Sequence, residues 1–263
     1  MTAEARDARN GRLLPFAIPW ESIPWWALIL AVVGLFVGWS VFTSEAYLDA
    51  LAFIVDGVRL TLQVTLISYL IALVIGLIFG LMRVSDNPIF YAASTLYVEV
   101  MRGVPLLVVI LYMGFVVTPR LRDATGDQID LQGLPAAILG IAVSYGAYMA
   151  EVYRGGIESI ERGQMEAARS LGMNYMQAMR HVILPQAIRR ILPPLGNDLI
   201  SMLKDSSLIS VIALNDLLQT GRLYVSRTYR AFEGYNTVAL LYLTMTLILS
   251  FAVRIVERKA AIE

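Results

Sequence analysis

Long apolar runs separated by short polar segments dominate this sequence. At about 1.5 Å of rise per residue, an 18-residue helical run extends roughly 27 Å, enough to cross the hydrocarbon core of a bilayer. We therefore predict an all-α polytopic membrane protein with six spanning segments and both termini on one side. The predicted spans are 25–42, 58–82, 104–117, 134–153, 195–214 and 236–253.

The first run, 25–42, has two interpretations. It is longer than the core of a typical signal peptide, and no convincing small-x-small cleavage site follows it. Trp25, Trp26 and Trp39 suit the two membrane interfaces. We interpret it as an uncleaved transmembrane helix preceded by a polar segment, 1–24, with a cleaved signal peptide as the alternative.

Residues 89–117 are too long and too polar for one simple span. Glu99 and Arg102 are spaced i, i+3 and can pair on one helix face. Gly103 and Pro105 follow directly, and both disfavour a continuous helix. We expect a surface-lying or tilted helix up to about residue 101, a bend, and then a span.

Several features inside the spans allow both a structural and a functional interpretation. Gly34-x-x-x-Gly38 and Gly76-x-x-x-Gly80 favour close helix packing over ligand contact. Lys204 and Asp205 are adjacent and point about 100° apart on a helix, so they need not pair with each other. They belong either to a polar network between helices or to the path of a transported molecule, and the same choice applies to Glu99 and Arg102.

The distribution of positive charge predicts the orientation. With the N-terminus in the cytoplasm, thirteen Lys and Arg residues fall on the inside and six on the outside. Cytoplasmic segments of membrane proteins are enriched in these residues. Both termini, and the polar segment 163–185, are therefore expected in the cytoplasm.

The 163–185 segment, GQMEAARSLGMNYMQAMRHVILP, is the main polar interruption of the chain. Gly163 is an acceptable N-cap, and Glu166 lies three residues later, where a carboxylate can reach back to the cap. We expect Gly172 to end a first short helix, and Pro185 to end a second one. Ala167 and Ala168 are small enough to let another surface approach closely.

Composition excludes several kinds of chemistry. The 263 residues are 57% hydrophobic and 16% charged, whereas a soluble domain has about 25% charged residues. The chain has no cysteine and one histidine, His181, which excludes Cys-based and His-rich metal sites within it. We expect no metal site, no cofactor and no catalytic residue in it. The net charge of zero gives no reason to expect nucleic acid. No Gly-x-x-x-x-Gly-Lys-Ser/Thr motif is present, so we expect any ATP and Mg to be bound by another chain.

The 163–185 segment resembles the EAA loop of ATP-binding-cassette importer permeases. The matching residues are Glu166, Ala167, Ala168, Gly172, Leu184 and Pro185. Val182 stands where that family has Ile, a conservative change in volume. The resemblance implies that these residues dock into a groove of a separate ATPase subunit and transmit its motion.

Other stretches are similar to the branch of these permeases that carries polar amino acids such as histidine, glutamine, glutamate and arginine. They are TLQVT at 61–65, RGVPLL at 102–107, GQ at 163–164 and LKDSSL at 203–208. The likeness covers roughly 55–255 and implies a type I importer transmembrane domain with a five-helix core, to which 25–42 adds one helix. It also implies a bacterial inner-membrane location, two ATPase subunits, a second permease that is identical or related, and an external binding protein that delivers an amino acid.

Two other functions remain open from the sequence. A secondary transporter driven by an ion gradient would also explain charged residues inside spans, but it leaves the 163–185 segment without a purpose. A membrane scaffold that only recruits a partner would not need so many polar groups within its helices. Dependence of uptake on a cytoplasmic ATPase, as against an ion gradient, separates the first two functions.

Overall fold

The computed structural model describes residues 43–262 and eight helical positions between 25 and 39, with backbone alone for 259–262. Every regular element in this described part is a helix, which confirms the predicted all-α class. Residues 1–48 and 49–263 form two separate compact units, and the second is described below. The predicted segment 1–24 and most of the predicted span 25–42 lie outside the described residues.

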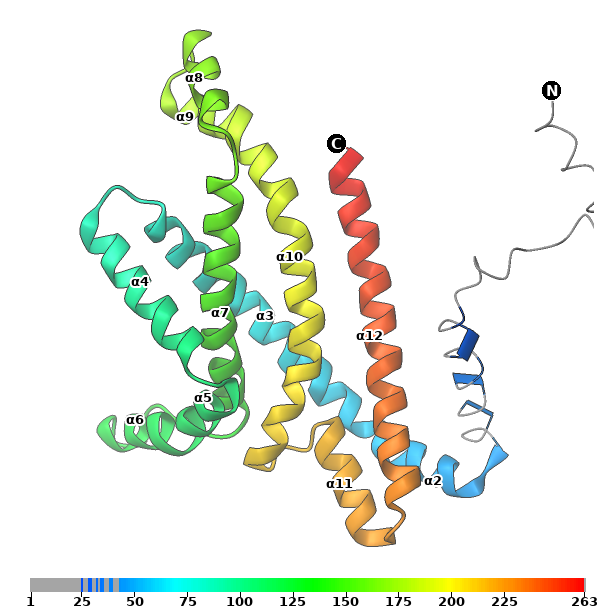
Figure 1. Ribbon diagram of the computed structural model, residues 1–263. Helices are drawn as coiled ribbons and strands as arrows, with labels where there is room; N and C mark the ends of the chain where they lie inside the picture. Colours follow the sequence, from blue (N-terminus) through cyan, green and yellow to red (C-terminus); the bar gives the residue numbers. More distant parts are fainter. Residues whose placement is uncertain are drawn as a thin grey trace, which may run out of the picture. The chain divides into compact units, whose positions relative to one another are not determined.

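Fourteen helical elements follow one another along the described chain, and Figure 1 labels the α-helices among them. In order, they are α2 (Glu45–Ile54), α3 (Asp56–Arg83), α4 (Pro88–Gly103), α5 (Leu106–Tyr112), the π-helix η2 (Met113–Val117), α6 (Thr118–Ala124), α7 (Leu134–Glu158), α8 (Arg162–Ser170), α9 (Tyr175–Ala178), the π-helix η3 (Met179–Ile183), α10 (Leu184–Asp205), the 3-10 helix η4 (Ser206–Ile212), α11 (Leu217–Thr228) and α12 (Ala231–Ile262).

Three helical stretches in the described residues are long and apolar enough to cross a membrane: Glu45–Arg83, Leu134–Glu158 and Ala231–Arg258. A fourth results if the bent pair Pro88–Gly103 and Leu106–Ala124 is counted as one span. The predicted span 195–214 falls on the second half of α10 and on η4. It is not among these stretches, because Asn197, Asp198, Lys204 and Asp205 make that part of the chain too polar.

The chain bends by 102° between α4 and α5, where Gly103 and Pro105 predicted a break. Two regions predicted as loops contain helix instead. Residues 118–133 begin with α6, which continues directly from η2, and 215–235 contain α11. Helix α11 begins at a strong cap, since the carboxylate of Asp216 accepts hydrogen bonds from the backbone N–H of Leu218 and of Gln219.

The contact between α3 and α7 is built on small residues. A Cβ added to Gly80 would lie 2.8 Å from the Cβ of Tyr153 and 2.9 Å from the carbonyl oxygen of Ala150. A Cβ on Gly76 would lie 2.6 Å from that of Met149. The two helices therefore approach as closely as the Gly76-x-x-x-Gly80 motif predicted, and close van der Waals packing of this kind drives helix association in a membrane.

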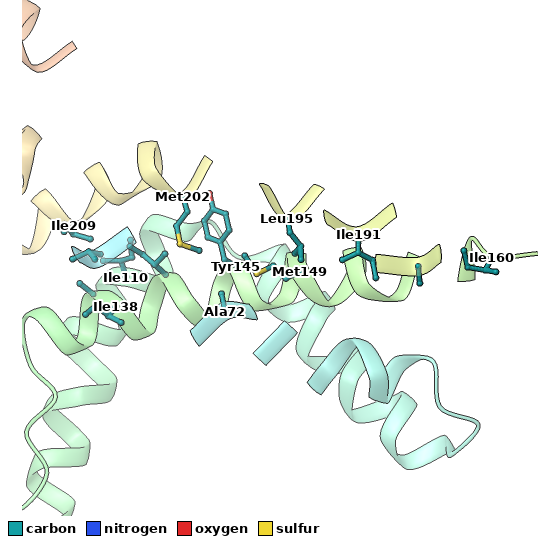
Figure 2. Close-up of a cluster of buried hydrophobic side chains, with 14 of the residues drawn as sticks. Ala72, Ile110, Ile138, Tyr145, Met149, Ile160, Ile191, Leu195, Met202 and Ile209 are labelled. Carbon is teal, nitrogen blue, oxygen red and sulfur yellow. The ribbon is translucent and has the colours of Figure 1, made fainter. Parts of the chain in front are cut away.

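The largest buried cluster lies along α7. Tyr145 and Met149 of α7 lie beside Leu195 and Met202 of α10, and Ala72 of α3 belongs to the same cluster (Figure 2). Hydrogen bonds reinforce this packing: the Tyr69 hydroxyl of α3 donates to the carbonyl oxygen of Leu195 at 3.1 Å. Helix α7 is thus the element around which α3 and α10 are assembled.

The polar residues at the start of the predicted second span are also explained by packing. Thr61 is fully buried, donates to the carbonyl oxygen of Gly57, and accepts a hydrogen bond from the N–H of Leu217 at 3.0 Å. Thr65 is buried as well and donates to the carbonyl oxygen of Thr61 at 2.7 Å. These hydroxyls satisfy buried backbone groups rather than contacting lipid.

Replacing Gly80 by Ala is expected to lower the melting temperature of the purified protein in detergent. The added methyl has to displace the backbone of α7, and overpacking of this kind costs about 1–3 kcal/mol. Gly155→Ala is the matched control, because nothing lies within 4 Å of a Cβ there. The control should melt at the same temperature or higher, since Ala favours a helix over Gly. Equal melting of the two variants would contradict the close contact.

Candidate functional site

The 163–185 segment is a compact helical turn at one end of α7 and α10 (Figure 1). Its first helix, α8, begins at Arg162 with Glu161 as N-cap, so the prediction of Gly163 as the cap was wrong. The Glu161 side chain makes no capping hydrogen bond. The backbone N–H of Gln164 instead donates to the carbonyl oxygen of Glu161, so Gly163 already lies inside the helix.

Gly172 ends α8, as predicted, and the geometry shows why glycine stands there. The N–H of Met173 bonds to the carbonyl oxygen of Ala168, and the N–H of Gly172 bonds to that of Arg169. These two bonds make a Schellman turn, which requires a left-handed residue after the last helical one. Gly172 has a φ of +86°, a conformation that costs other residues energy.

The second part of the segment differs from the prediction. Asn174 and Gln177 form a capping box that starts α9, and their spacing of three residues is the local sequence signal for this helix start. Pro185 does not end the helix but lies in the first turn of α10. The π-helix η3 comes directly before α10, as η2 does before α6, and the second residue of each following helix is a proline, Pro185 or Pro119. A wider π turn accommodates a residue that has no N–H to donate and a bulky ring.

The residues that carry the resemblance differ in exposure. Ala168 is only 4% exposed and packs inward, whereas Glu166, Ala167, Leu184 and Pro185 are exposed. The Glu166 side chain makes no ion pair or hydrogen bond with any residue in the part of the chain that the structure describes. Glu166 is therefore free to contact another protein.

Exposed apolar side chains surround this turn. Leu171, Tyr175 and Met176 are 82%, 59% and 69% exposed. A shallow hollow of about 300 Å³ lies beside them, lined by Leu171, Gly172, Met173, Gln177 and His181. Exposed apolar groups around a hollow with a polar rim are typical of protein interaction sites.

Two polar contacts lie in the segment and beside it. The amide nitrogen of Gln186 in α10 donates to the side-chain oxygen of Gln164 in α8 at 3.4 Å. The Arg190 guanidinium of α10 donates to the carbonyl oxygen of Ser159, directly after α7. The segment is thus held to α10, and α10 is held to the residue that follows α7.

Glu99 and Arg102 do not form the pair that their spacing suggested. Glu99 pairs with Arg83 of α3 at 3.6 Å, and Arg102 lies 4.0 Å from Glu151 of α7. Glu151 also pairs with Arg83 at 2.7 Å and with Arg154 at 2.8 Å. The Glu151 carboxylate therefore connects the ends of three helices, α3, α4 and α7. Because its partners come from different helices, residue spacing within one helix does not predict these ion pairs.

A cavity of about 260 Å³ lies between α5, α7 and α10. Its lining residues are Leu106, Ser144, Tyr145, Tyr148, Asp198, Ser201 and Asp205. Asp205 accepts a hydrogen bond from the Tyr145 hydroxyl at 2.7 Å. Lys204 is exposed and does not line the cavity, so the two adjacent residues do point in different directions, as expected. Of the four candidate path residues Glu99, Arg102, Lys204 and Asp205, only Asp205 lines this cavity.

A family model described as "Binding-protein-dependent transport system inner membrane component" matches residues 72–262. The chain belongs to this family. It is therefore a permease component of an ATP-binding-cassette importer, embedded in the inner membrane, in a family that works with separate ATPase and substrate-binding proteins. The permease itself is not the ATPase.

Individual relatives agree with the family. The glutamine transport system permease protein GlnP of Escherichia coli K12 is 35% identical, over 84% of this chain and 99% of GlnP. A probable amino-acid ABC transporter permease protein, YckA of Bacillus subtilis 168, is 36% identical over 84% of this chain and 95% of its own. A chain in the crystal structure of an amino acid ABC transporter with histidines is 38% identical, covers 79% of this chain and 94% of its own, and superimposes with a TM-score of 0.71. The fold is that of a type I importer transmembrane domain.

Replacing Glu151 by Gln is expected to lower the thermal stability of the permease in detergent. The change leaves Arg83, Arg102 and Arg154 close together without their shared counter-charge, and Glu151 is only 19% exposed. Removing one partner of a buried ion pair costs about 3–5 kcal/mol, and partial exposure reduces this to on the order of 2 kcal/mol.

The matched control is Glu158→Gln. Among the described residues Glu158 pairs with Arg154 alone, and it is 47% exposed, so its loss should be nearly neutral. Equal melting temperatures for the two variants would show that Glu151 does not join the helices.

Proposed function

We propose that this chain forms the translocation path for a polar amino acid that an external binding protein delivers. Transport is driven by two cytoplasmic ATPases that bind ATP and Mg, and a second permease subunit, identical or related, completes the path. Relatives at 35% and 36% identity are named as glutamine and amino-acid permeases, and this supports an amino acid as the substrate.

The observation that carries the coupling role is the geometry of the 163–185 segment. Glu166 has no partner in the described chain, Ala167 is exposed beside it, and a rigid Schellman turn at Gly172 presents apolar side chains. A surface of this kind at the end of two core helices fits insertion into a groove of an ATPase. In this proposal Glu166, Ala167, Ala168 and Gly172 make and shape the contact, and Leu184 and Pro185 start the helix that carries the motion onward.

The proposal includes an arrangement in the membrane. Both termini and the 163–185 segment lie in the cytoplasm, in agreement with the excess of Lys and Arg on that side. Residues 1–24 form a cytoplasmic segment, 25–42 an extra transmembrane helix, and 55–255 the permease core. The family match over 72–262 overlaps this core and gives no support to the alternative of an ion-gradient-driven transporter.

Glu166→Lys and Gly172→Leu are expected to uncouple the importer. The first reverses the charge of the exposed carboxylate, and the second places a side chain at a φ of +86°, which reshapes the turn. In proteoliposomes that contain the whole complex, ATP-driven uptake should fall at least tenfold, while the permease stays in the membrane and ATP hydrolysis continues.

Glu161→Lys is the matched control for charge, because Glu161 is an exposed carboxylate five residues before Glu166 and its side chain makes no capping bond. It should transport normally. Normal uptake by Glu166→Lys or Gly172→Leu would contradict the coupling role.

A further inference from the structure

Helices α10 and α12 run side by side (Figure 1), and a groove of about 230 Å³ lies between them. It is separate from the cavity that Asp205 lines. The stretch Ala231–Arg258 is long and apolar enough to cross a membrane, so the groove offers an apolar surface at membrane depth. Its exposed residues Ala252 and Val256 leave it open on the α12 side. Six apolar residues make up most of the lining: Leu192, Leu199, Leu249, Ala252, Val253 and Val256.

Glu257 is the one charged side chain among the described residues that line this groove. Its carboxylate lies against α10, since Oε1 would be only 3.5 Å from a Cβ on Gly196, where the missing side chain leaves it room. The carboxylate makes no ion pair or hydrogen bond with any residue that the structure describes. Glu257 is half-buried, and a charge withdrawn from water is costly unless it is paired. The groove therefore suits a ligand that brings a cation.

Arg254 supplies the opposite charge one turn away. It precedes Glu257 by three residues, about 4.5 Å along α12, is exposed, and has no ion pair among the described residues. Because the spanning stretch ends at Arg258, Glu257 lies nearer to its end than Arg254 does. A long Arg side chain can keep its stem on apolar surface and its charge at the level of the lipid headgroups. The order along α12 toward the middle of the membrane is therefore a carboxylate, a guanidinium and a hydrocarbon-lined groove.

The length of the groove matches one leaflet of a bilayer. Leu249 and Glu257 are eight residues apart, which is about 12 Å along a helix. The hydrocarbon core of a bilayer is about 30 Å thick, so one leaflet contributes roughly 15 Å. A groove that starts at the headgroup level and extends this far accommodates most of one acyl chain.

We propose that the groove between α10 and α12 binds one phospholipid whose headgroup carries a primary ammonium, a phosphatidylethanolamine. The ammonium group, outermost in such a lipid, donates hydrogen bonds to the Glu257 carboxylate. The phosphate, one step deeper, accepts from the Arg254 guanidinium, and an acyl chain lies in the groove between Leu192 and Val253. A choline headgroup has the same charges but no N–H to donate, and a glycerol headgroup has no cation. Glu257 therefore selects the ethanolamine headgroup.

The test measures lipid binding to the intact permease–ATPase complex, purified in detergent and freed of its own lipid. Native mass spectrometry follows the titration of phosphatidylethanolamine, phosphatidylcholine and phosphatidylglycerol, all with the same two oleoyl chains. Phosphatidylethanolamine should bind about five- to tenfold more tightly than either of the others, because a charge-assisted hydrogen bond to a half-buried carboxylate is gained. Glu257→Gln should remove most of this preference, since the amide keeps the shape of the side chain without its charge.

Three further variants keep the result decisive. Glu233→Gln removes a carboxylate at the opposite end of α12, outside the groove, and should leave the lipid preference unchanged. Glu257→Asp keeps the charge and should retain part of the preference, which separates loss of charge from misfolding. Leu249→Trp fills the part of the groove that holds the acyl chain and should weaken the binding of phosphatidylethanolamine, with Glu257 intact.

Equal binding of phosphatidylethanolamine and phosphatidylcholine would overturn the inference, and so would a preference that persists in Glu257→Gln. Tighter binding of phosphatidylglycerol would show that the arginines alone attract the lipid and that Glu257 plays no part. Absence of any saturable binding, the result expected if a second permease subunit covers the groove, would overturn it as well.

Discussion

The close approach of α3 to α7 is the constraint on which the rest of the molecule depends. Gly76 and Gly80 leave room for Met149, Ala150 and Tyr153 to lie directly against the α3 backbone. In a membrane this contact gains little from the hydrophobic effect and relies on van der Waals fit. Helix α7, fixed in this way, provides one wall of the cavity between α5, α7 and α10, carries Glu151, and ends at Glu158, shortly before the 163–185 segment.

The order of elements explains how a signal from an ATPase would reach the cavity. The 163–185 segment joins α7 to α10, and these two helices carry six of the seven residues that line the cavity. Gln186 holds the segment to α10, and Arg190 of α10 bonds to Ser159, directly after α7. In the proposed coupling role, the segment that contacts the ATPase and the cavity in the membrane share the same two helices.

Sequence reasoning was most successful where the signal is local. The long apolar runs predicted the helical class, Gly172 predicted the end of α8, and Gly103 with Pro105 predicted the bend after α4, because each signal lies within one continuous stretch of the chain. The prediction that Pro185 ends a helix was wrong, because the π turn before α10 allows a proline in the first turn of that helix. It was incomplete where partners come from different helices: Glu99 and Arg102 pair with Arg83 and Glu151, and Asp205 with Tyr145. Residue spacing within one helix cannot predict pairs that form between different helices.

The central claim, that this chain transports an amino acid only when a separate ATPase acts on it, is tested most directly by uptake into proteoliposomes. The permease would be purified gently with every chain that accompanies it, and reconstituted with and without its ATPase. The account predicts uptake that requires the ATPase, ATP and the external binding protein, and that is unaffected when ion gradients are collapsed. Uptake by this chain alone, driven by an ion gradient in the absence of ATP, would contradict it.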